Sequence, residues 1–247
     1  MTQSEIKFVK SLSLQKYRKE HKAYLIHGNK IVKEWLEAGA DFLYLIASED
    51  WVKAQGNALP GFIQEKLRIV PEHVLAKLSQ QDTPAPVMAV IKMPPVSEPH
   101  FDIKDWTIVL DRIQDPGNLG TIIRTADWFG IQEVWLTPHS VELYNPKVIQ
   151  STMGSFLRVK TAEISLESLF QNAKKKIWLT AMQGISVFDE AFTAEESGYI
   201  VLGNESHGVD VSFLERTKNL LTIPKKWRSR ITQCSYCQCC DLCSTCS

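Results

Sequence analysis

The sequence lacks cysteine along most of its length, lacks long apolar runs and lacks a net charge. Its first 233 residues contain no cysteine, which excludes a disulfide-stapled scaffold for the body of the chain. No apolar run approaches the ~18 residues that a membrane-spanning helix needs. The N-terminus is polar and then basic, which argues against a secretory signal and favours a cytoplasmic location. With 28 basic and 28 acidic side chains in 247 residues, the composition is that of a globular protein.

The charge is balanced in total but uneven along the chain. Residues 1–33 carry eight basic side chains against two acidic ones, and residues 225–247 carry four against one. Basic ends on a neutral protein suit a polyanionic partner such as a nucleic acid. A solvated helix face explains the same pattern, and charge alone favours that simpler explanation.

A proline-rich stretch divides the chain into two parts. Residues 92–101 contain three prolines and no periodicity, so we predict a domain over 1–95, a linker over 96–104 and a second domain over 105–247. Both parts alternate apolar strands with helical patterns, which predicts two α/β domains, the second with a parallel sheet covered on both faces. The strands are expected at 23–26, 42–46, 67–70, 87–91, 106–110, 133–136, 176–180, 199–202 and 220–223, and the helices at 3–21, 29–38, 71–79, 118–129, 146–154, 165–175 and 210–218.

The most informative stretch runs from Asp111 to Gly130 and reads DRIQDPGNLGTIIRTADWFG. A strand ends just before it, Asp-Pro-Gly-Asn forms a turn, and Asn118 can cap the following helix. Arg124 projects from the polar face of that helix. The glycine-rich turn suits an anion-binding loop as well as a plain strand-to-helix connection, and it matches neither a dinucleotide fingerprint nor a P-loop.

A second polar loop follows the strand at 199–202 and reads Gly-Asn-Glu-Ser-His-Gly. Loops at the carboxyl ends of parallel strands are where α/β sheets bind ligands. Glu205 can bind, orient or exchange a proton, and His207 is a possible general base, although an exposed loop histidine is the simpler interpretation.

These loops carry a family resemblance. Residues 115–130 and the Leu-Gly-Asn-Glu-x-x-Gly segment at 202–208 resemble motifs one and two of the SpoU/TrmH-type RNA methyltransferases of the SPOUT superfamily. Ile223-Pro224 resembles the opening of motif three. The N-terminal part, with Lys-Tyr-Arg-Lys-Glu at 16–20 and Ile-His-Gly at 26–28, is similar to the L30e-like substrate-binding domain that often precedes that catalytic domain.

The resemblance implies S-adenosylmethionine as methyl donor, a ribose 2′-OH of ribosomal or transfer RNA as acceptor, and no metal. It also implies a parallel-sheet SPOUT domain with a trefoil knot, an exception to the rule against knots, and a homodimer with shared active sites. Carried over by position, the residues are Asn118, Arg124 and Glu205 for catalysis, Leu202, Gly203 and Ile223 for the cofactor, and Lys16, Arg18, Lys19 and Lys22 for RNA phosphates.

The C-terminal tail departs from the family. Motif three normally continues into glycine, Ser-Leu-Asn and an alanine- and valine-rich helix that completes the knot, whereas this chain continues with Lys-Lys-Trp and then carries all six of its cysteines within 234–246. Cysteines with C-x-x-C spacing can bind zinc. This cluster leaves no room for a folded knuckle between ligand pairs, and a catalytically impaired RNA-binding protein is the alternative function if the tail is authentic.

The genetic code offers another explanation of the tail. If one base is dropped at the codon of Trp227, the next codon encodes glycine, and Ile-Thr-Gln-Cys at 231–234 can be read as Ser-Leu-Asn-Val. Every later cysteine codon becomes alanine or valine in that frame. We therefore favour the hypothesis that residues 227–247 result from a frameshift in the gene or in its reported sequence.

Overall fold

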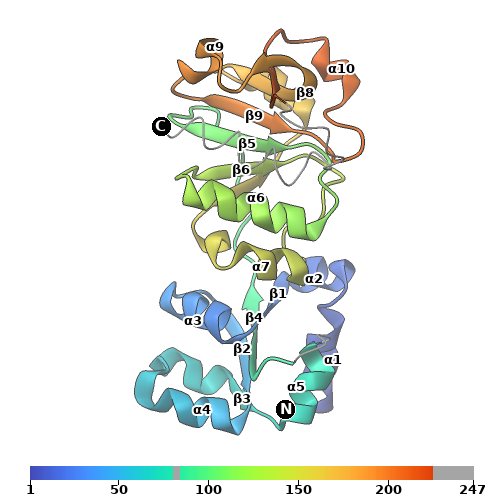
Figure 1. Ribbon diagram of the computed structural model, residues 1–247. Helices are drawn as coiled ribbons and strands as arrows, with labels where there is room; N and C mark the ends of the chain where they lie inside the picture. Colours follow the sequence, from blue (N-terminus) through green and yellow to red (C-terminus); the bar gives the residue numbers. More distant parts are fainter. Residues whose placement is uncertain (80–83, 225–247) are drawn as a thin grey trace. The chain divides into compact units, whose positions relative to one another are not determined.

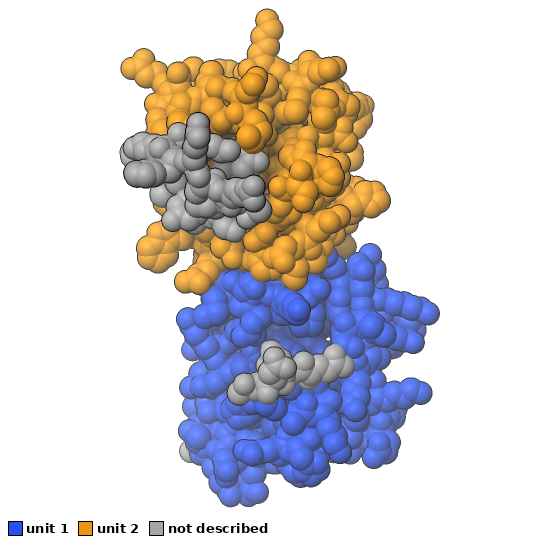
Figure 2. All heavy atoms as spheres, turned by 45° about the vertical axis from the view of Figure 1, so that its right-hand side comes forward, with its two compact units in different colours: residues 1–95, 142–157 blue, residues 96–141, 158–247 orange. Residues whose placement is uncertain are grey.

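The chain forms two compact units in a computed structural model that describes residues 1–79 and 84–224 (Figure 2). Unit 1 comprises Met1–Pro95 together with Glu142–Leu157. Unit 2 comprises Val96–Val141 and the chain from Arg158 onward. Within the described ranges, no helix has the length and apolarity needed to cross a membrane.

Unit 1 is built on a four-stranded sheet with the order β1-β4-β2-β3 (Figure 1). Strand β4 is antiparallel to both of its neighbours, and β2 is parallel to β3. The elements in chain order are α1 (Gln3–Ser11), α2 (Gln15–His21), β1 (Ala23–His27), α3 (Asn29–Glu37), β2 (Phe42–Ala47), α4 (Glu49–Gln55), η1 (Gly56–Ala58), η2 (Gly61–Lys66), β3 (Leu67–Ile69), α5 (Glu72–Ser79), β4 (Val87–Lys92), α7 (Pro146–Thr152) and η3 (Ser155–Leu157).

The predicted helix over 3–21 is interrupted between α1 and α2. The guanidinium of Arg18 donates hydrogen bonds to the backbone carbonyls of Leu12 (2.8 Å) and Ser13 (2.7 Å). These carbonyls therefore bind a side chain in place of the amides that a continuous helix would supply. The apolar periodicity continues through the break, which explains why the sequence pattern predicts one helix.

Residues 142–157 complete the core of unit 1. The ring of Tyr144 lies 4.9 Å from that of Tyr24, and the ring of Phe156 lies 6.2 Å from that of Trp35. Trp35, which is fully buried, donates a 2.8 Å hydrogen bond from Nε1 to the Tyr24 hydroxyl. This aromatic cluster joins residues more than a hundred positions apart, so nothing local in the sequence indicates that 142–157 belongs to unit 1.

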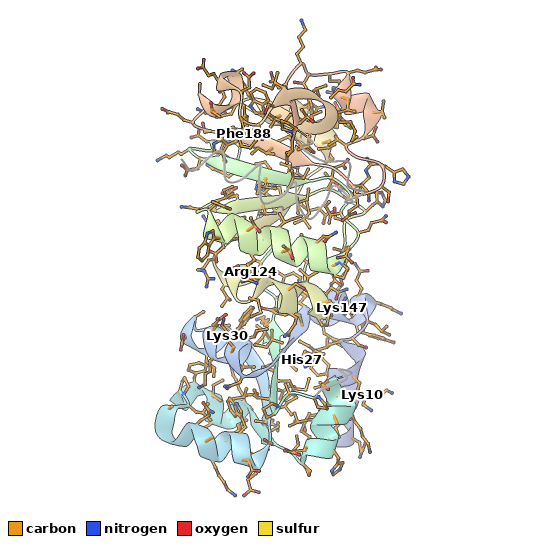
Figure 3. All side chains as sticks on the ribbon, viewed as in Figure 1. Lys10, His27, Lys30, Arg124, Lys147 and Phe188 are labelled. Carbon is orange, nitrogen blue, oxygen red and sulfur yellow. The ribbon has the colours of Figure 1, made fainter. Side chains whose placement is uncertain are left out.

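The buried imidazole of His27 makes the stability of unit 1 depend on pH. Burial lowers the pKa of His27, at the end of β1, from 6.5 to about 4 (Figure 3). Between about pH 6.5 and about pH 4, His27 is protonated in the unfolded chain but not in the folded chain, so the free energy of unfolding falls as the pH drops through this range. In denaturant titrations, we expect the free energy of unfolding of His27→Gln to fall by about 3 kcal/mol less than that of the parent over the same range. Equal losses in parent and variant would contradict this account.

Unit 2 contains a six-stranded sheet with the order β10-β8-β9-β5-β6-β7, and every strand pair in it is parallel. Helix α6 lies against the sheet (Figure 1) and buries its apolar stripe of Leu119, Ile122, Ile123 and Ala126. The elements are β5 (Trp106–Leu110), α6 (Pro116–Trp128), β6 (Glu133–Leu136), β7 (Lys160–Glu163), α8 (Leu166–Asn172), β8 (Ile177–Ser186), α9 (Glu190–Thr193), β9 (Gly198–Leu202), α10 (Val211–Leu214) and β10 (Leu220–Thr222).

The predicted parallel α/β class is confirmed, and the differences lie at the edges of unit 2. Strand β7 is missing from the prediction because it is an edge strand with only one buried residue, Ala162. Phe101 and Ile103 of the predicted linker pack against the core of unit 2. The residues expected to complete the trefoil knot lie in the tail, outside the described residues.

Candidate active site

The candidate site lies where the strand order of unit 2 reverses. From β5 the chain proceeds outward through β6 and β7, and it then returns to place β9 directly against the other side of β5. Parallel α/β sheets bind ligands in the crevice at the carboxyl ends of such a strand pair. The loops that follow β5 and β9, residues 111–115 and 203–210, are the two motif loops of the sequence prediction.

Asn118 and Glu205 come together from these two loops. The side-chain amide of Asn118 donates a 2.7 Å hydrogen bond to Oε1 of Glu205. Asp115, and not the predicted Asn118, caps helix α6, because its carboxylate accepts the backbone N–H of Asn118 at 2.8 Å. The side chain of Asn118 is therefore available for Glu205, and the sequence prediction of Asn118 as the cap is wrong.

Arg124 lies on the same helix but does not join this pair. It is six residues beyond Asn118 on α6, which corresponds to about 9 Å along the helix axis. Its side chain is exposed, and it makes no ion pair with any residue of the described part (Figure 3). Two of the three predicted catalytic residues thus meet within one chain, and the third projects from the surface of α6.

The loop after β9 folds tightly back on itself. Asn204 and Gly208 exchange backbone hydrogen bonds of 3.1 and 2.8 Å. Oδ1 of Asn204 accepts the backbone N–H groups of Ser206 and His207. A Cβ at Gly203 would collide with the backbone of Val209, so only glycine fits there. His207 is an exposed loop residue, in agreement with the simpler interpretation of this histidine.

A buried carboxylate ties this loop to its neighbours. Asp111 is 3% exposed and follows β5 directly. Its side chain accepts hydrogen bonds from Arg112, from the Thr137 hydroxyl (3.1 Å) and from the backbone N–H of Asp210 (3.2 Å). The hydrogen-bonded Asp111 carboxylate raises the pKa of the Arg112 guanidinium. The sequence prediction passed over Asp111, although an acid directly after a fully buried strand is a signal of such a role.

The three predicted cofactor residues lie at the carboxyl edge of the sheet. Leu202 is the last residue of β9 and is buried, and Gly203 follows it. Ile223 comes directly after β10, which lies beside β8. The two apolar residues and the glycine therefore lie at the same edge of the sheet as the Asn118–Glu205 pair.

Of the four predicted RNA-contact residues, Arg18 does not fit the prediction. Lys16, Lys19 and Lys22 are exposed. Arg18 is 3% exposed, and its guanidinium forms an ion pair with Glu142 in addition to its bonds to the carbonyls of Leu12 and Ser13. Four of the five N–H donors of this buried guanidinium are engaged within unit 1, so it is not placed to bind an RNA phosphate. The charge of Arg18 therefore stabilises the fold of unit 1.

This correction leads to a prediction for stability. Replacing Arg18 by methionine leaves Glu142 as an unpaired, largely buried carboxylate, and we expect a loss of about 3–5 kcal/mol in the free energy of unfolding. The same substitution at the exposed Lys19 should change stability by no more than about 0.5 kcal/mol. Denaturant titrations measure both variants. If Arg18→Met kept the parental stability and weakened only RNA binding, the sequence prediction would be right after all.

The described residues contain no group of three or more His, Cys, Asp or Glu side chains that could hold a metal ion. The zinc hypothesis concerns the six cysteines of the tail, which lie outside the described ranges.

Comparisons with known proteins agree with both halves of the sequence prediction. Residues 105–230 match the model of the SpoU rRNA Methylase family. Residues 3–89 match the model of the MRM3-like substrate binding domain. Both predicted parts of the chain therefore have a counterpart among known families.

Relatives match the chain over nearly its whole length. The 23S rRNA (guanosine(2553)-2′-O)-methyltransferase RlmP of Bacillus subtilis is 30% identical over 89% of this chain and 87% of its own length. A putative RNA methyltransferase of the TrmH family from Porphyromonas gingivalis, also 30% identical, superimposes with a TM-score of 0.84 over 99% of this chain and 98% of its own. An rRNA methyltransferase from Sinorhizobium meliloti, solved with AdoMet bound, is 24% identical and superimposes with a TM-score of 0.83 over 99% of this chain and 95% of its own.

Proposed function

The chain belongs to the SpoU rRNA methylase family, and from this membership we infer that it is an S-adenosylmethionine-dependent RNA 2′-O-methyltransferase acting on ribosomal RNA. The observation that carries the inference is the Asn118–Glu205 contact, because it joins the two family motifs at the ligand-binding edge of the sheet. The relatives favour ribosomal RNA over transfer RNA, the other substrate implied by the sequence.

The residues at the sheet edge fit the cofactor. Leu202 and Ile223 offer apolar side chains, and the partly exposed Gly203 offers backbone polar groups to an adenosyl group. We propose that these three residues hold S-adenosylmethionine, whose sulfonium supplies an electrophilic methyl group when bound.

We propose that Arg124 clamps the phosphate next to the target ribose. A guanidinium keeps its proton under ordinary conditions, which argues against a role as general base. Its paired N–H donors match a phosphate and stabilise negative charge on the ribose oxygen as that oxygen loses its proton. The exposed position of Arg124 on α6 suits a contact with RNA or with a site shared between two copies of the chain.

We propose that Glu205 orients Asn118. The carboxylate accepts one amide N–H of Asn118, which fixes the amide plane and directs its carbonyl oxygen away from Glu205. That oxygen can accept a hydrogen bond from the ribose 2′-OH and so hold the nucleophile in a reactive direction. Both residues then act by positioning, and the 2′-OH proton passes to solvent water, so the chain's own groups need not provide a strong base.

We propose that unit 1 binds the RNA through the exposed Lys16, Lys19 and Lys22. The match of residues 3–89 to a substrate-binding domain supports this role. We also propose a homodimer with shared active sites and a trefoil-knotted second domain, as the family resemblance implies, and a cytoplasmic location.

Titration with S-adenosylmethionine tests this function against the catalytically impaired alternative. Saturable binding that is followed by methyl transfer to ribosomal RNA supports the enzyme. RNA binding without any heat of cofactor binding supports the alternative, in which the tail spoils the cofactor site.

A further inference from the structure

We propose that Asp111 is a positioning residue of the methyltransferase site, acting through the loop that carries Glu205. The proposal rests on the proposed roles of Asn118 and Glu205. The Asp111 carboxylate contacts the loops that follow three neighbouring strands, β9, β5 and β6.

The first step of the argument is the placement of the carboxylate. Asp111 is buried, and its two oxygens face Nε and Nη2 of Arg112, the Thr137 hydroxyl and the Asp210 backbone amide, all at 2.9–3.2 Å. All of these groups can donate, so a carboxylate satisfies them and a carboxamide of the same shape cannot satisfy them all. A buried charge with such a donor set stabilises one arrangement of the loops.

The second step is the backbone of Arg112. Its φ of 55° lies in the left-handed region, which costs a residue other than glycine roughly 1 kcal/mol. In this conformation its N–H donates to the Thr137 hydroxyl (2.9 Å), and its carbonyl accepts the Asn204 amide (2.9 Å). The Asp111–Arg112 ion pair, at 2.9 Å, accompanies a strained backbone that directly holds the β9 loop.

The third step is the loop itself. Asn204 is bound to the Arg112 carbonyl near one end of the loop, and the Asp210 amide is bound to Asp111 at the other. Glu205 lies between these two attachments, within the turn closed by Asn204 and Gly208. The position of its carboxylate relative to Asn118 therefore depends on Asp111 directly at one end of the loop and through Arg112 at the other.

The test separates positioning from simple stabilisation by a double-mutant cycle. We expect Asp111→Asn to lower the methyl-transfer rate at saturating substrates by roughly ten- to a hundredfold. In a Glu205→Ala background the same substitution should lower the rate less than twofold further, while its effect on the melting temperature stays the same in both backgrounds. Losses in rate that multiply, or a single variant with more than half of the parental rate, would overturn the proposal.

Matched variants make the outcome specific. Asp105→Asn makes the same chemical change on an exposed acid at the opposite end of β5, and we expect it to keep the parental rate. Thr137→Val, which removes only the hydroxyl between Asp111 and Arg112, provides a milder variant if Asp111→Asn fails to fold. In the Glu205→Ala background, Thr137→Val should likewise lower the methyl-transfer rate little further.

A readout without turnover keeps this proposal distinct from the proposed function. In ¹⁵N-asparagine-labelled protein, the side-chain amide signal of Asn118, assigned by its absence in Asn118→Ala, reports the hydrogen bond to Glu205. We expect Asp111→Asn to move this signal to its position in Glu205→Ala, and Asp105→Asn to leave it unchanged. An unmoved signal overturns the positioning role, whereas a parent that transfers no methyl group overturns only the function.

Discussion

Arg124→Lys should lower the rate of methyl transfer at saturating substrates by about 10²–10³-fold while the dissociation constant for S-adenosylmethionine changes less than about twofold. Lysine keeps the positive charge but loses the planar pair of donors that binds a phosphate in two places. The residues proposed to bind the cofactor lie at or directly after the ends of β9 and β10, and not on the outer face of α6. The change should therefore affect turnover and not cofactor binding.

Single-turnover methylation and calorimetric titration of the cofactor measure these two effects separately. Arg158→Lys is a matched control, because Arg158 is an exposed arginine of unit 2 near the amino end of β7, paired with Asp127. We expect the control to keep the parental rate. A lysine variant at position 124 with the parental rate, or one that loses cofactor affinity as steeply as rate, would show that the proposed phosphate clamp is wrong.

Restoring the family reading frame from codon 227 should strengthen cofactor binding. The frameshift hypothesis predicts that resequencing of the gene shows a single-base discrepancy near that codon. A chain with the restored tail contains the glycine and Ser-Leu-Asn of motif three. Because a bound ligand of this size normally has most of its surface buried, adding a missing pocket wall should tighten S-adenosylmethionine binding by roughly a hundredfold.

Two controls decide how this result is interpreted. A chain with a scrambled version of the restored tail separates the motif from a general effect of tail composition, and we expect it to bind no better than the chain as printed. Elemental analysis of the printed chain tests the zinc alternative by its metal content. Authentic in-frame codons, together with equal cofactor affinity for the printed and restored tails, would refute the frameshift hypothesis.

The parts of the fold that depend on local pattern could be predicted from the sequence. The buried strands before both motif loops were predictable because they are largely apolar runs, as in Trp106–Leu110 and Gly198–Leu202. The interruption between α1 and α2 was not, because it depends on Arg18, whose ion pair with Glu142 spans 124 positions. Long-range pairs of this kind leave no periodic trace in a single sequence.

The candidate site, like the fold, could be predicted from the sequence only in part. Asn118 and Glu205 were predicted from family motifs, and the structure places them 2.7 Å apart. The role of Asp111 was missed, because a carboxylate that binds backbone amides and neighbouring side chains has no motif of its own. The residues of the tail match neither a folded zinc knuckle nor the family motif. Only the codons that can encode them suggested an explanation of the tail.

The most direct test of the central claim is methylation of unmodified ribosomal RNA with radiolabelled S-adenosylmethionine, using both the printed and the restored-tail chain. A 2′-O-methyl group removes the nucleophile that alkali needs to cleave the RNA backbone at that nucleotide. We expect label in an alkali-resistant dinucleotide from one position, and loss of that product in Arg124→Lys. Label on a base, or no incorporation with either chain, would contradict the assignment of this protein as a ribose 2′-O-methyltransferase.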